Sequence, residues 1–149
     1  MNVSEFLSIT SAIVPEREAI VFGNQRITYF ELQDRVNRLA NALEGLGVTS
    51  GDRIAAMQVN CNEHIETYLA ATKLDALFVP VNFRARSEEV TFMLNDSGAK
   101  ALVFGSRYSE LVKSIAQELT SVEHFIVLED PVEGFLFYDD LVKDAAEDE

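Results

Sequence analysis

The chain has a single cysteine, Cys61, no tryptophan and only three prolines. One cysteine excludes an internal disulfide, which fits a reducing environment. No apolar run approaches the roughly 20 residues that span a bilayer, and the first residues lack the charged and apolar regions of a signal peptide. We therefore expect a cytoplasmic protein with no transmembrane segment, whose contact with a membrane, if any, is peripheral.

Basic residues are also scarce, with 12 Lys and Arg against 25 Asp and Glu, so the formal net charge is −13. Such a chain repels a phosphate backbone instead of neutralising it, which predicts that nucleic acid is not a partner. Part of the acidic excess lies in residues 139–149. We expect this stretch to form a solvated, fraying tail.

Hydrophobic residues are plentiful: they make up 48% of the 149 residues. A chain of this length buries roughly 70% of the surface that its unfolded form exposes, enough for one core. No repeat, low-complexity stretch or linker divides the sequence. We predict a single domain over residues 1–149.

The first predicted element is a β-hairpin over residues 19–28, because Gly23 and Asn24 tolerate the positive φ of a tight turn. Thr28 and Glu31 then have the spacing of a capping box, which predicts that a helix begins there. Its apolar residues recur at three- and four-residue steps on one face, which we expect to pack on a sheet. These residues are Leu32, Val36, Leu39, Ala40, Leu43 and Leu46. Gly45 and Gly47 end the helix.

Strands and helices then alternate along the rest of the chain. The predicted strands are residues 53–59, 77–81, 100–104 and 124–128, followed by 135–138 and a last helical stretch. The predicted helices are residues 63–73, a segment from its cap at Ser87 to Gly98, and a segment whose apolar face holds Leu111, Val112, Ile115 and Leu119. Strands joined by helical crossovers run parallel. The fold class is therefore α/β: three layers, a mainly parallel sheet and an N-terminal β-hairpin.

In the helix over residues 63–73, Asn60 is the expected cap. Ile65, Tyr68, Leu69 and Thr72 share one side by helical spacing, and we expect that side to face the core.

The segment Gly45–Gly51 loosely resembles a dinucleotide-binding loop. Such a loop must follow a strand and open a helix, because the helix N-terminus receives the pyrophosphate. Here the order is reversed, so the pattern favours a helix stop and a turn. The chain also has no G-x-x-x-x-G-K-[ST] loop, which excludes a complete P-loop NTPase.

Cys61, Glu63, His64 and Glu66 cluster near a predicted helix start, where a helix dipole lowers a thiol pKa. A nucleophile or a metal site is one interpretation. The spacing supplies no orienting group, oxyanion pocket or further metal ligand, which favours a packed cysteine and a partly exposed histidine. His124, alone at the start of a strand, is interpreted as structural.

Arg84 and Arg86 follow the carboxyl end of a strand, where ligands bind in parallel sheets. Two guanidinium groups there suit an anion, whereas arginines before a capped helix are also common on surfaces. Both interpretations remain open at this point.

Seven stretches together resemble the AMP-binding, acyl-activating superfamily, which includes acyl-CoA synthetases. They are Pro15 with residues 19–22, then 27–32, 39–43, 47–55, 60–63, 79–84 and 96–100. Their order and spacing cover nearly the whole chain. Two departures are Asp75-Ala76, where Gly-Ala is frequent in the family, and the absence of a proline near Asn62.

The resemblance implies an ATP-dependent acid–thiol ligase that activates a carboxylic acid, with a fatty acid as the first candidate, through an acyl-adenylate. ATP, Mg²⁺ and CoA are implied for the full-length enzyme and none of them for this chain. The family's phosphate loop, adenine- and ribose-contacting motifs and catalytic lysine come later in the sequence. We therefore expect no catalytic, cofactor-binding or metal-binding residue in this chain, which would be an inactive N-terminal scaffold segment.

Two further expectations concern partners. The main partner would be the remainder of the same polypeptide, and a segment removed from it should expose apolar surface and self-associate. The alternative is a free-standing α/β binding or interaction domain.

Overall fold

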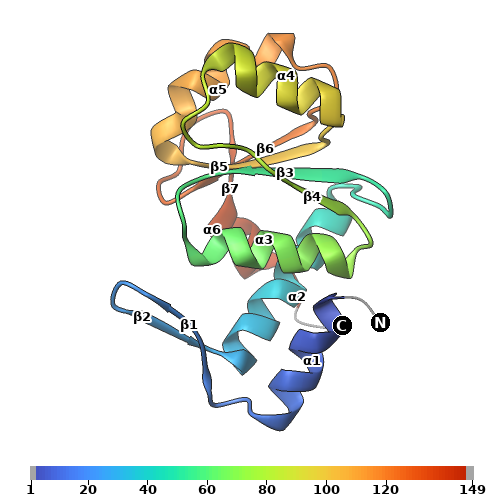
Figure 1. Cartoon of the computed structure of the whole chain (residues 1–149), viewed down its shortest axis with the longest axis vertical. Coiled ribbons are helices and arrows are strands. Elements are labelled where there is room, and N and C mark those ends of the chain that lie inside the picture. Colours follow the sequence, from blue (N-terminus) through green and yellow to red (C-terminus); the bar gives the residue numbers. More distant parts are fainter. Residues whose placement is uncertain (1–2, 147–149) are drawn as a thin grey trace.

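The computed structural model describes residues 3–146, arranged as a parallel β-sheet between two layers of helices (Figure 1). Its helices are α1 Val3–Ile13, α2 Tyr29–Gly45, α3 Asn62–Lys73, α4 Ser87–Ser97, α5 Ser109–Ile115 and α6 Tyr138–Asp144. Its strands are β1 Glu18–Phe22, β2 Gln25–Thr28, β3 Arg53–Met57, β4 Leu77–Pro80, β5 Ala101–Gly105, β6 His124–Leu128 and β7 Leu136–Phe137. Short 3₁₀ turns flank α5. The predicted α/β class is confirmed.

The N-terminal part contains one helix that the sequence pattern did not predict. In α1 the polar stripe of Ser4, Ser8 and Ser11 lies on the side toward α2, while Phe6, Ile9 and Ile13 point outward, the reverse of the usual pattern of a surface helix. The predicted hairpin is present as the antiparallel pair β1–β2. At the start of α2, the Glu31 amide donates to Thr28 Oγ1 (3.2 Å), and the Thr28 amide donates to the Glu31 carboxylate (2.7 Å). The capping box is therefore confirmed.

The five-stranded sheet has the order β4-β3-β5-β6-β7, and each neighbouring pair is parallel. From β3 the chain moves outward to β4 and then returns past β3 to β5, so the winding changes direction between β3 and β5. In open α/β sheets such a switch point leaves a crevice at the carboxyl ends of the strands.

Alternate residues of each strand point to opposite faces, which divides the core in two. Ile54, Val103 and Ile126 face the layer that contains α2, α3 and α6. Leu102, Phe104 and Val127 face the other layer, together with Val90 and Leu94 of α4 and Val112 of α5. Figure 1 shows α4 and α5 on the opposite side of the sheet from α2, α3 and α6. α1 packs outside the first layer, against α2 and α3.

The predicted inner face of α3 is correct for Leu69, which is buried, and wrong for Ile65 and Tyr68. Ile65 and Tyr68 are 43% and 37% exposed, whereas Glu66 and Ala70 are completely buried. α3 packs closely against α2, which favours alanines at the contact. The predicted cap also shifts, because Cys61, not Asn60, occupies the N-cap position, and it makes no capping hydrogen bond through its side chain.

α4 begins one residue earlier than predicted, since Arg86, and not Ser87, is its N-cap and Ser87 is its first residue. The Arg86 amide donates to the Glu89 carboxylate at 2.7 Å. Gly98 ends α4 in the left-handed conformation, as predicted, with φ 64°. Arg53 of β3 donates to the carbonyls of Ser97 (2.7 Å) and Gly98 (3.0 Å), so it joins the end of α4 to the sheet.

The expectation of a fraying acidic tail from residue 139 is wrong for the part that the structure describes. Residues 138–144 form α6, and Val142 is buried. Beyond it, the carbonyls of Ala145 and Ala146 each accept a 2.9 Å hydrogen bond from α2, from Arg38 Nη1 and Asn41 Nδ2. Residues 147–149 lie outside the described residues.

Candidate functional site

A completely buried carboxylate lies where α2, α3 and α6 meet. Arg35 approaches Glu66 with two nitrogens, Nε at 2.7 Å from Oε1 and Nη2 at 3.1 Å from Oε2. Asn62 Nδ2 donates to Oε1 at 2.8 Å, and Tyr138 Oη donates to Oε2 at 2.6 Å. Both carboxylate oxygens therefore accept two hydrogen bonds each, which offsets the cost of burying the charge.

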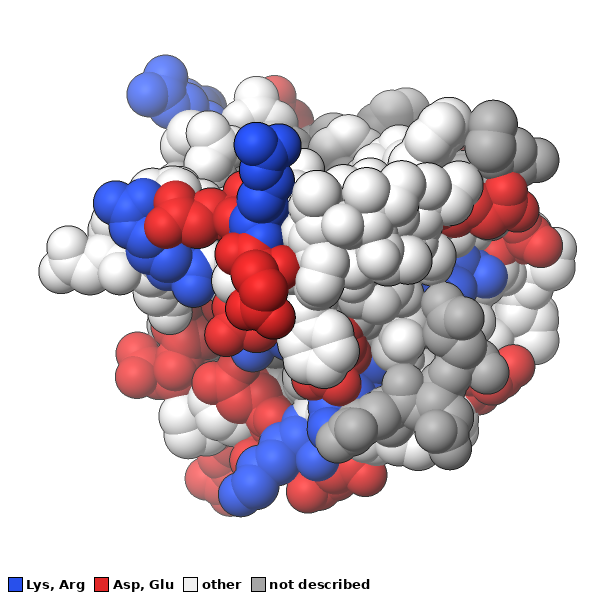
Figure 2. Space-filling model, turned by 90° about the horizontal axis from the view of Figure 1, so that it is seen from below, with Lys and Arg blue, Asp and Glu red and all other residues white. Residues whose placement is uncertain are grey.

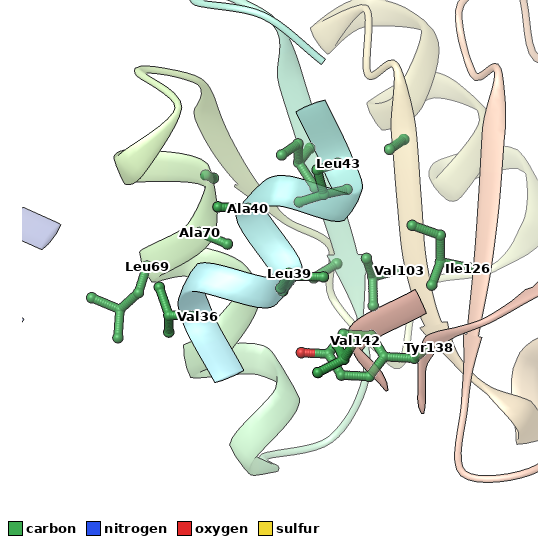
Figure 3. Packing of buried hydrophobic residues seen from close by; sticks show 14 of the residues in the cluster. Val36, Leu39, Ala40, Leu43, Leu69, Ala70, Val103, Ile126, Tyr138 and Val142 are labelled. Atoms are coloured by element: carbon green, nitrogen blue, oxygen red, sulfur yellow. The ribbon is translucent and has the colours of Figure 1, made fainter. Parts of the chain in front are cut away.

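Three separate segments supply this cluster. Asn62 and Glu66 are one turn apart on α3, so they lie on the same side of it. Arg35 extends from α2, and Tyr138 is the first residue of α6. Figure 3 shows the Tyr138 ring among the aliphatic side chains of the core, near Val103 and Val142, with its hydroxyl directed away from the sheet.

The electrostatics of the cluster follow from its burial. Desolvation, together with the adjacent Glu66, raises the pKa of Tyr138 well above its usual range. Burial by itself would lower the pKa of Arg35, but the hydrogen bonds and charge of Glu66 outweigh this effect and raise it. Near neutral pH, Tyr138 is therefore held neutral and Arg35 charged.

A hollow lies over the outer side of this cluster. Its lining carries both signs of charge in equal number: Arg26, Arg35, Arg38 and Lys143 against Glu31, Asp34, Glu63 and Asp139. Opposite charges pair within the lining, as Arg38 does with Asp34 at 3.1 Å. The hollow thus has no excess charge to select an anion or a cation, and the buried cluster below it links helices together.

Cys61 and His64 do not form a nucleophilic pair. Burial raises the pKa of the Cys61 thiol to about 12, so the reactive thiolate is scarce at neutral pH. His64 packs edge-on against Phe78 with ring centroids 5.1 Å apart, and burial lowers its pKa. Glu66 points instead into the Arg35 cluster. The structural interpretation of this segment therefore accounts for it better than a catalytic one.

In the turn between α2 and β3, Asp52 is hydrogen-bonded to the turn itself and to Lys100. Asp52 accepts hydrogen bonds from the amide and hydroxyl of Thr49 (2.8 and 3.1 Å) and from Lys100 Nζ (3.0 Å). These contacts, the Thr49 amide first, lower the pKa of Asp52. Gly47 and Gly51 have positive φ angles of 87° and 82°. The segment leaves a helix and enters a strand, as predicted for a helix stop.

The carboxyl edge of the sheet is also occupied by side chains at its switch point. Gln58, after β3, donates through Nε2 to Glu129 at 2.7 Å, and Ser106, after β5, donates to the same carboxylate at 2.9 Å. The Gln58 side chain lies against Gly105, where a Cβ atom would collide with it. Gln58 and Glu129 thus bridge the ends of β3, β5 and β6.

Arg84 and Arg86 lie beyond the end of the edge strand β4. The Arg84 guanidinium stacks over the Phe83 ring, 5.5 Å from its centroid. Arg86 begins α4. A shallow hollow beside them is lined by Arg84 but also by Glu88 and Glu89, whose charge opposes an anion.

His124 Nε2 is 3.9 Å from the Glu123 carboxylate, beyond hydrogen-bonding distance, and is buried without a hydrogen-bond partner among the described residues. Within residues 3–146, no group of three or more His, Cys, Asp or Glu side chains is placed to hold a metal ion.

Comparison with known proteins assigns the family. A profile of the AMP-binding enzyme family matches residues 9–148, nearly the full length. The chain belongs to the AMP-binding enzyme family. It is 32% identical over 152 aligned residues to a long-chain-fatty-acid–CoA ligase of Thermus thermophilus, covering 99% of this chain and 28% of that protein. It is 31% identical over 130 residues to a 3-oxocholest-4-en-26-oate–CoA ligase of Rhodococcus rhodochrous, covering 87% and 23%.

Solved structures of other AMP-binding enzymes have the same fold. An anthranilate CoA ligase in complex with anthranoyl-AMP superimposes with a TM-score of 0.92 at 25% identity, over 99% of this chain and 30% of that one. The inhibitor-bound N-terminal domain of FACL13 from Mycobacterium tuberculosis gives a TM-score of 0.87 at 28% identity, over 99% and 36%. The chain thus spans about a quarter of the length of the curated AMP-binding relatives and about a third of an N-terminal domain.

The buried Glu66 cluster was not predicted from the sequence. Its only local signal is the pair Asn62 and Glu66, four residues apart on one side of a helix. Arg35 and Tyr138 are 31 and 72 residues away from Glu66. No spacing rule connects residues so distant.

Proposed function

We propose that this chain is the N-terminal scaffold segment of an ATP-dependent acyl-CoA ligase. The observation that carries the proposal is the family match over residues 9–148, combined with coverage of only 28% of the Thermus relative. A chain with this share of the family's length supplies one structural part of the enzyme. We propose that residues 1–149 fold together as one α/β unit of that part.

The substrate class proposed for the complete enzyme is a carboxylic acid, with a fatty acid as the first candidate. The names of the relatives support a carboxylate: a long-chain fatty acid in one and the steroid acid 3-oxocholest-4-en-26-oate in another. A third relative, a feruloyl-CoA synthase of Amycolatopsis, is 40% identical over 102 residues, covering 68% of this chain and 21% of that protein. The common feature of these acids is the carboxylate, whereas their carbon skeletons differ.

The proposed reaction has two steps. A carboxylate oxygen of the acid attacks the α-phosphorus of ATP, forming an acyl-adenylate and releasing pyrophosphate. The CoA thiolate then attacks the acyl carbon, forming a thioester and releasing AMP. The anthranoyl-AMP in the related anthranilate CoA ligase is an acyl-adenylate, which supports this intermediate.

ATP, Mg²⁺ and CoA are assigned to the complete enzyme. The described residues do not fit a magnesium site of their own, because no three potential ligands converge there. The contribution of the chain is to hold the sheet and its covering helices in place, with Glu66, Arg35 and Tyr138 fastening three of the helices together.

Two properties of the isolated chain follow from this role: absence of ligase activity and a tendency to self-associate. The side chains that were candidates for chemistry are engaged in structural contacts, as Glu66 is, or have a raised pKa, as Cys61 has. The surface retains exposed large apolar side chains, such as Phe92, which is 67% exposed. Exposed apolar patches drive association.

A cytoplasmic location is also proposed for the enzyme, in which any contact with a membrane is limited to the membrane surface. No described helix combines the length and apolarity needed to cross a bilayer. The single cysteine is compatible with a reducing compartment.

The deciding experiment is carboxylate-dependent exchange of pyrophosphate into ATP. It is measured with the chain ending at Glu149 and with the complete product of its open reading frame, using fatty, steroid and aromatic acids in the presence of Mg²⁺. We expect exchange in the complete protein and none in the shorter chain. Exchange by the shorter chain would refute the scaffold role.

The complete protein also tests the alternative of a free-standing binding domain. An open reading frame that stops at Glu149 would favour that alternative. A frame that continues into a protein without exchange activity on any acid tested would refute the ligase assignment.

A further inference from the structure

The outer face of α1 is apolar, and no described residue covers it. Phe6, Ile9 and Ile13 are 56%, 49% and 72% exposed, and Val3 is 42% exposed. Only Leu7 and Ser11 of this helix are buried, on the side that faces α2 and α3. The inward side carries Ser8 and Ser11, so the more apolar side of this helix faces outward, the reverse of a surface helix of a complete globular domain.

This face forms an uncharged area on the molecule. Within Val3–Ile13 the only charged residue is Glu5. Figure 2, a view of the side on which α1 lies, shows a broad uncharged area next to a strip of acidic and basic side chains. Contiguous exposed apolar surface on an otherwise charged protein marks a site of interaction.

The described chain ends close to this helix. Ser8 of α1 donates to Gln33 of α2 at 3.2 Å, and Asn41 of α2 donates to the Ala146 carbonyl at 2.9 Å. Gln33 and Asn41 are eight positions apart, which is about 12 Å along α2 and about 80° around it. The last described residues therefore lie on the part of the α2 surface next to the side that contacts α1.

We propose that the outer face of α1 is the docking site for the polypeptide downstream of residue 149. The inference rests on the proposed function, in which this chain is part of a longer ligase. To that function the inference adds a specific interface, in which Phe6, Ile9 and Ile13 pack against downstream residues. The last described backbone group before the downstream polypeptide is the carbonyl of Ala146, which Asn41 holds on α2.

The charge pattern argues against a lipid surface as the occupant. Helices that lie on membranes carry Lys and Arg beside their apolar face, and α1 has neither. The net charge of −13 also opposes anionic lipids. A second copy of the chain is the competing occupant, and the test separates it from the downstream polypeptide.

The test measures thiol labelling at Ile13→Cys in a Cys61→Ser background. The substitution is placed both in the chain ending at Glu149 and in the complete protein, and a maleimide is added at several protein concentrations. We expect labelling in the complete protein to be at least about tenfold slower than in the dilute short chain, because a covered thiol reacts only when its contact opens. This slowing should not depend on concentration.

Two controls accompany it. Leu7→Cys, on the buried side of α1, should react slowly in both proteins, and Ser114→Cys, exposed on α5, should react rapidly in both. Equal labelling of Ile13→Cys in both proteins would overturn the proposal. Protection that disappears on dilution would also overturn it, since it would identify a second copy as the occupant.

This result is independent of ligase activity. If the complete protein exchanges pyrophosphate but labels freely at Ile13→Cys, the proposed function is supported and the proposed interface is refuted. If the complete protein protects Ile13→Cys from labelling but has no exchange activity, the proposed interface is supported and the proposed function is refuted. A reading frame that stops at Glu149 overturns both.

Discussion

The hydroxyl of Tyr138 donates a 2.6 Å hydrogen bond to the Glu66 carboxylate, 72 residues earlier in the chain. Both side chains are completely buried. The bond links the first residue of α6 to the middle of α3, while Arg35 links the same carboxylate to α2. One carboxylate therefore connects helices from the beginning, middle and end of the chain.

Tyr138→Phe should destabilise the fold by about 1–3 kcal/mol, because it removes one donor from a buried carboxylate without changing the shape of the ring. Urea unfolding followed by circular dichroism measures the difference. Tyr68→Phe is the matched control, since Tyr68 is on the exposed side of α3 and should change stability little. Equal stability of the two variants would show that the hydrogen bond contributes nothing.

Glu66→Gln should destabilise the fold by about 2–3 kcal/mol. The substitution removes the negative charge that pairs with Arg35 and places an amide NH₂ group opposite other hydrogen-bond donors. Breaking a fully buried ion pair usually costs more, but Arg35 is about one-third exposed, so solvent offsets part of the loss. The same unfolding measurement applies. Glu110→Gln, at a side chain that is 90% exposed, should have no measurable effect. A loss at Glu66→Gln no larger than at Glu110→Gln would contradict the structural role.

Stability should fall in alkaline solution. The folded-state pKa of Tyr138 is raised above its unfolded value near 10, so its contribution is complete below about pH 10 and is lost as the pH rises further. Above about pH 10, the free energy of unfolding should fall by about 1.4 kcal/mol per pH unit for a group that ionises only in the unfolded state. Cys61, with its pKa raised to about 12, acts in the same direction from about pH 9, though less because it is partly exposed.

The measurement is a series of urea unfolding curves between about pH 8 and about pH 11. Tyr138→Phe should flatten the decline above about pH 10, and Cys61→Ser should flatten it from about pH 9. Tyr68→Phe should retain the original slope. A decline that all these variants share unchanged would assign it to other groups.

Gly98→Ala should destabilise the fold by at least about 1–2 kcal/mol, the cost of a left-handed conformation for a residue with a Cβ atom. The new methyl group would also displace the Arg53 guanidinium from the carbonyls at the end of α4. Thermal unfolding measures the loss. Gly45→Ala is the control, because its Cβ would meet nothing within 4 Å and its φ is not positive, so stability should stay equal or increase.

Local patterns predicted most of the fold correctly. The capping box at Thr28 and Glu31 fixed the start of α2, and Gly98 fixed the end of α4. The predicted strand at His124–Leu128 matches β6 residue for residue. Each of these signals involves residues within a few positions of one another, where short-range sterics and hydrogen bonds decide the conformation.

The wrong predictions concern which side of a helix is buried, and this depends on residues that are distant in the sequence. Ile65 and Tyr68 were expected inside because they share one side of the helix with Leu69 by helical spacing, yet Ala70 is completely buried, and close packing of α3 on α2 favours small side chains. α1 was missed because its polar stripe, Ser4, Ser8 and Ser11, faces α2 and its apolar side faces outward. Its outer side carries Phe6 and Ile13 into solvent in this chain.

The sequence by itself determined the order of strands and helices, the parallel sheet and the family, because caps, turns and periodicity are short-range and act along the chain. Tertiary structure alone decided that Glu66 is buried, since a carboxylate enters a core only where Arg35, Asn62 and Tyr138 supply its hydrogen bonds. Those donors come together only when α2, α3 and α6 pack on one face of the sheet. The burial of a charge is a property of that packing and not of any segment of the chain.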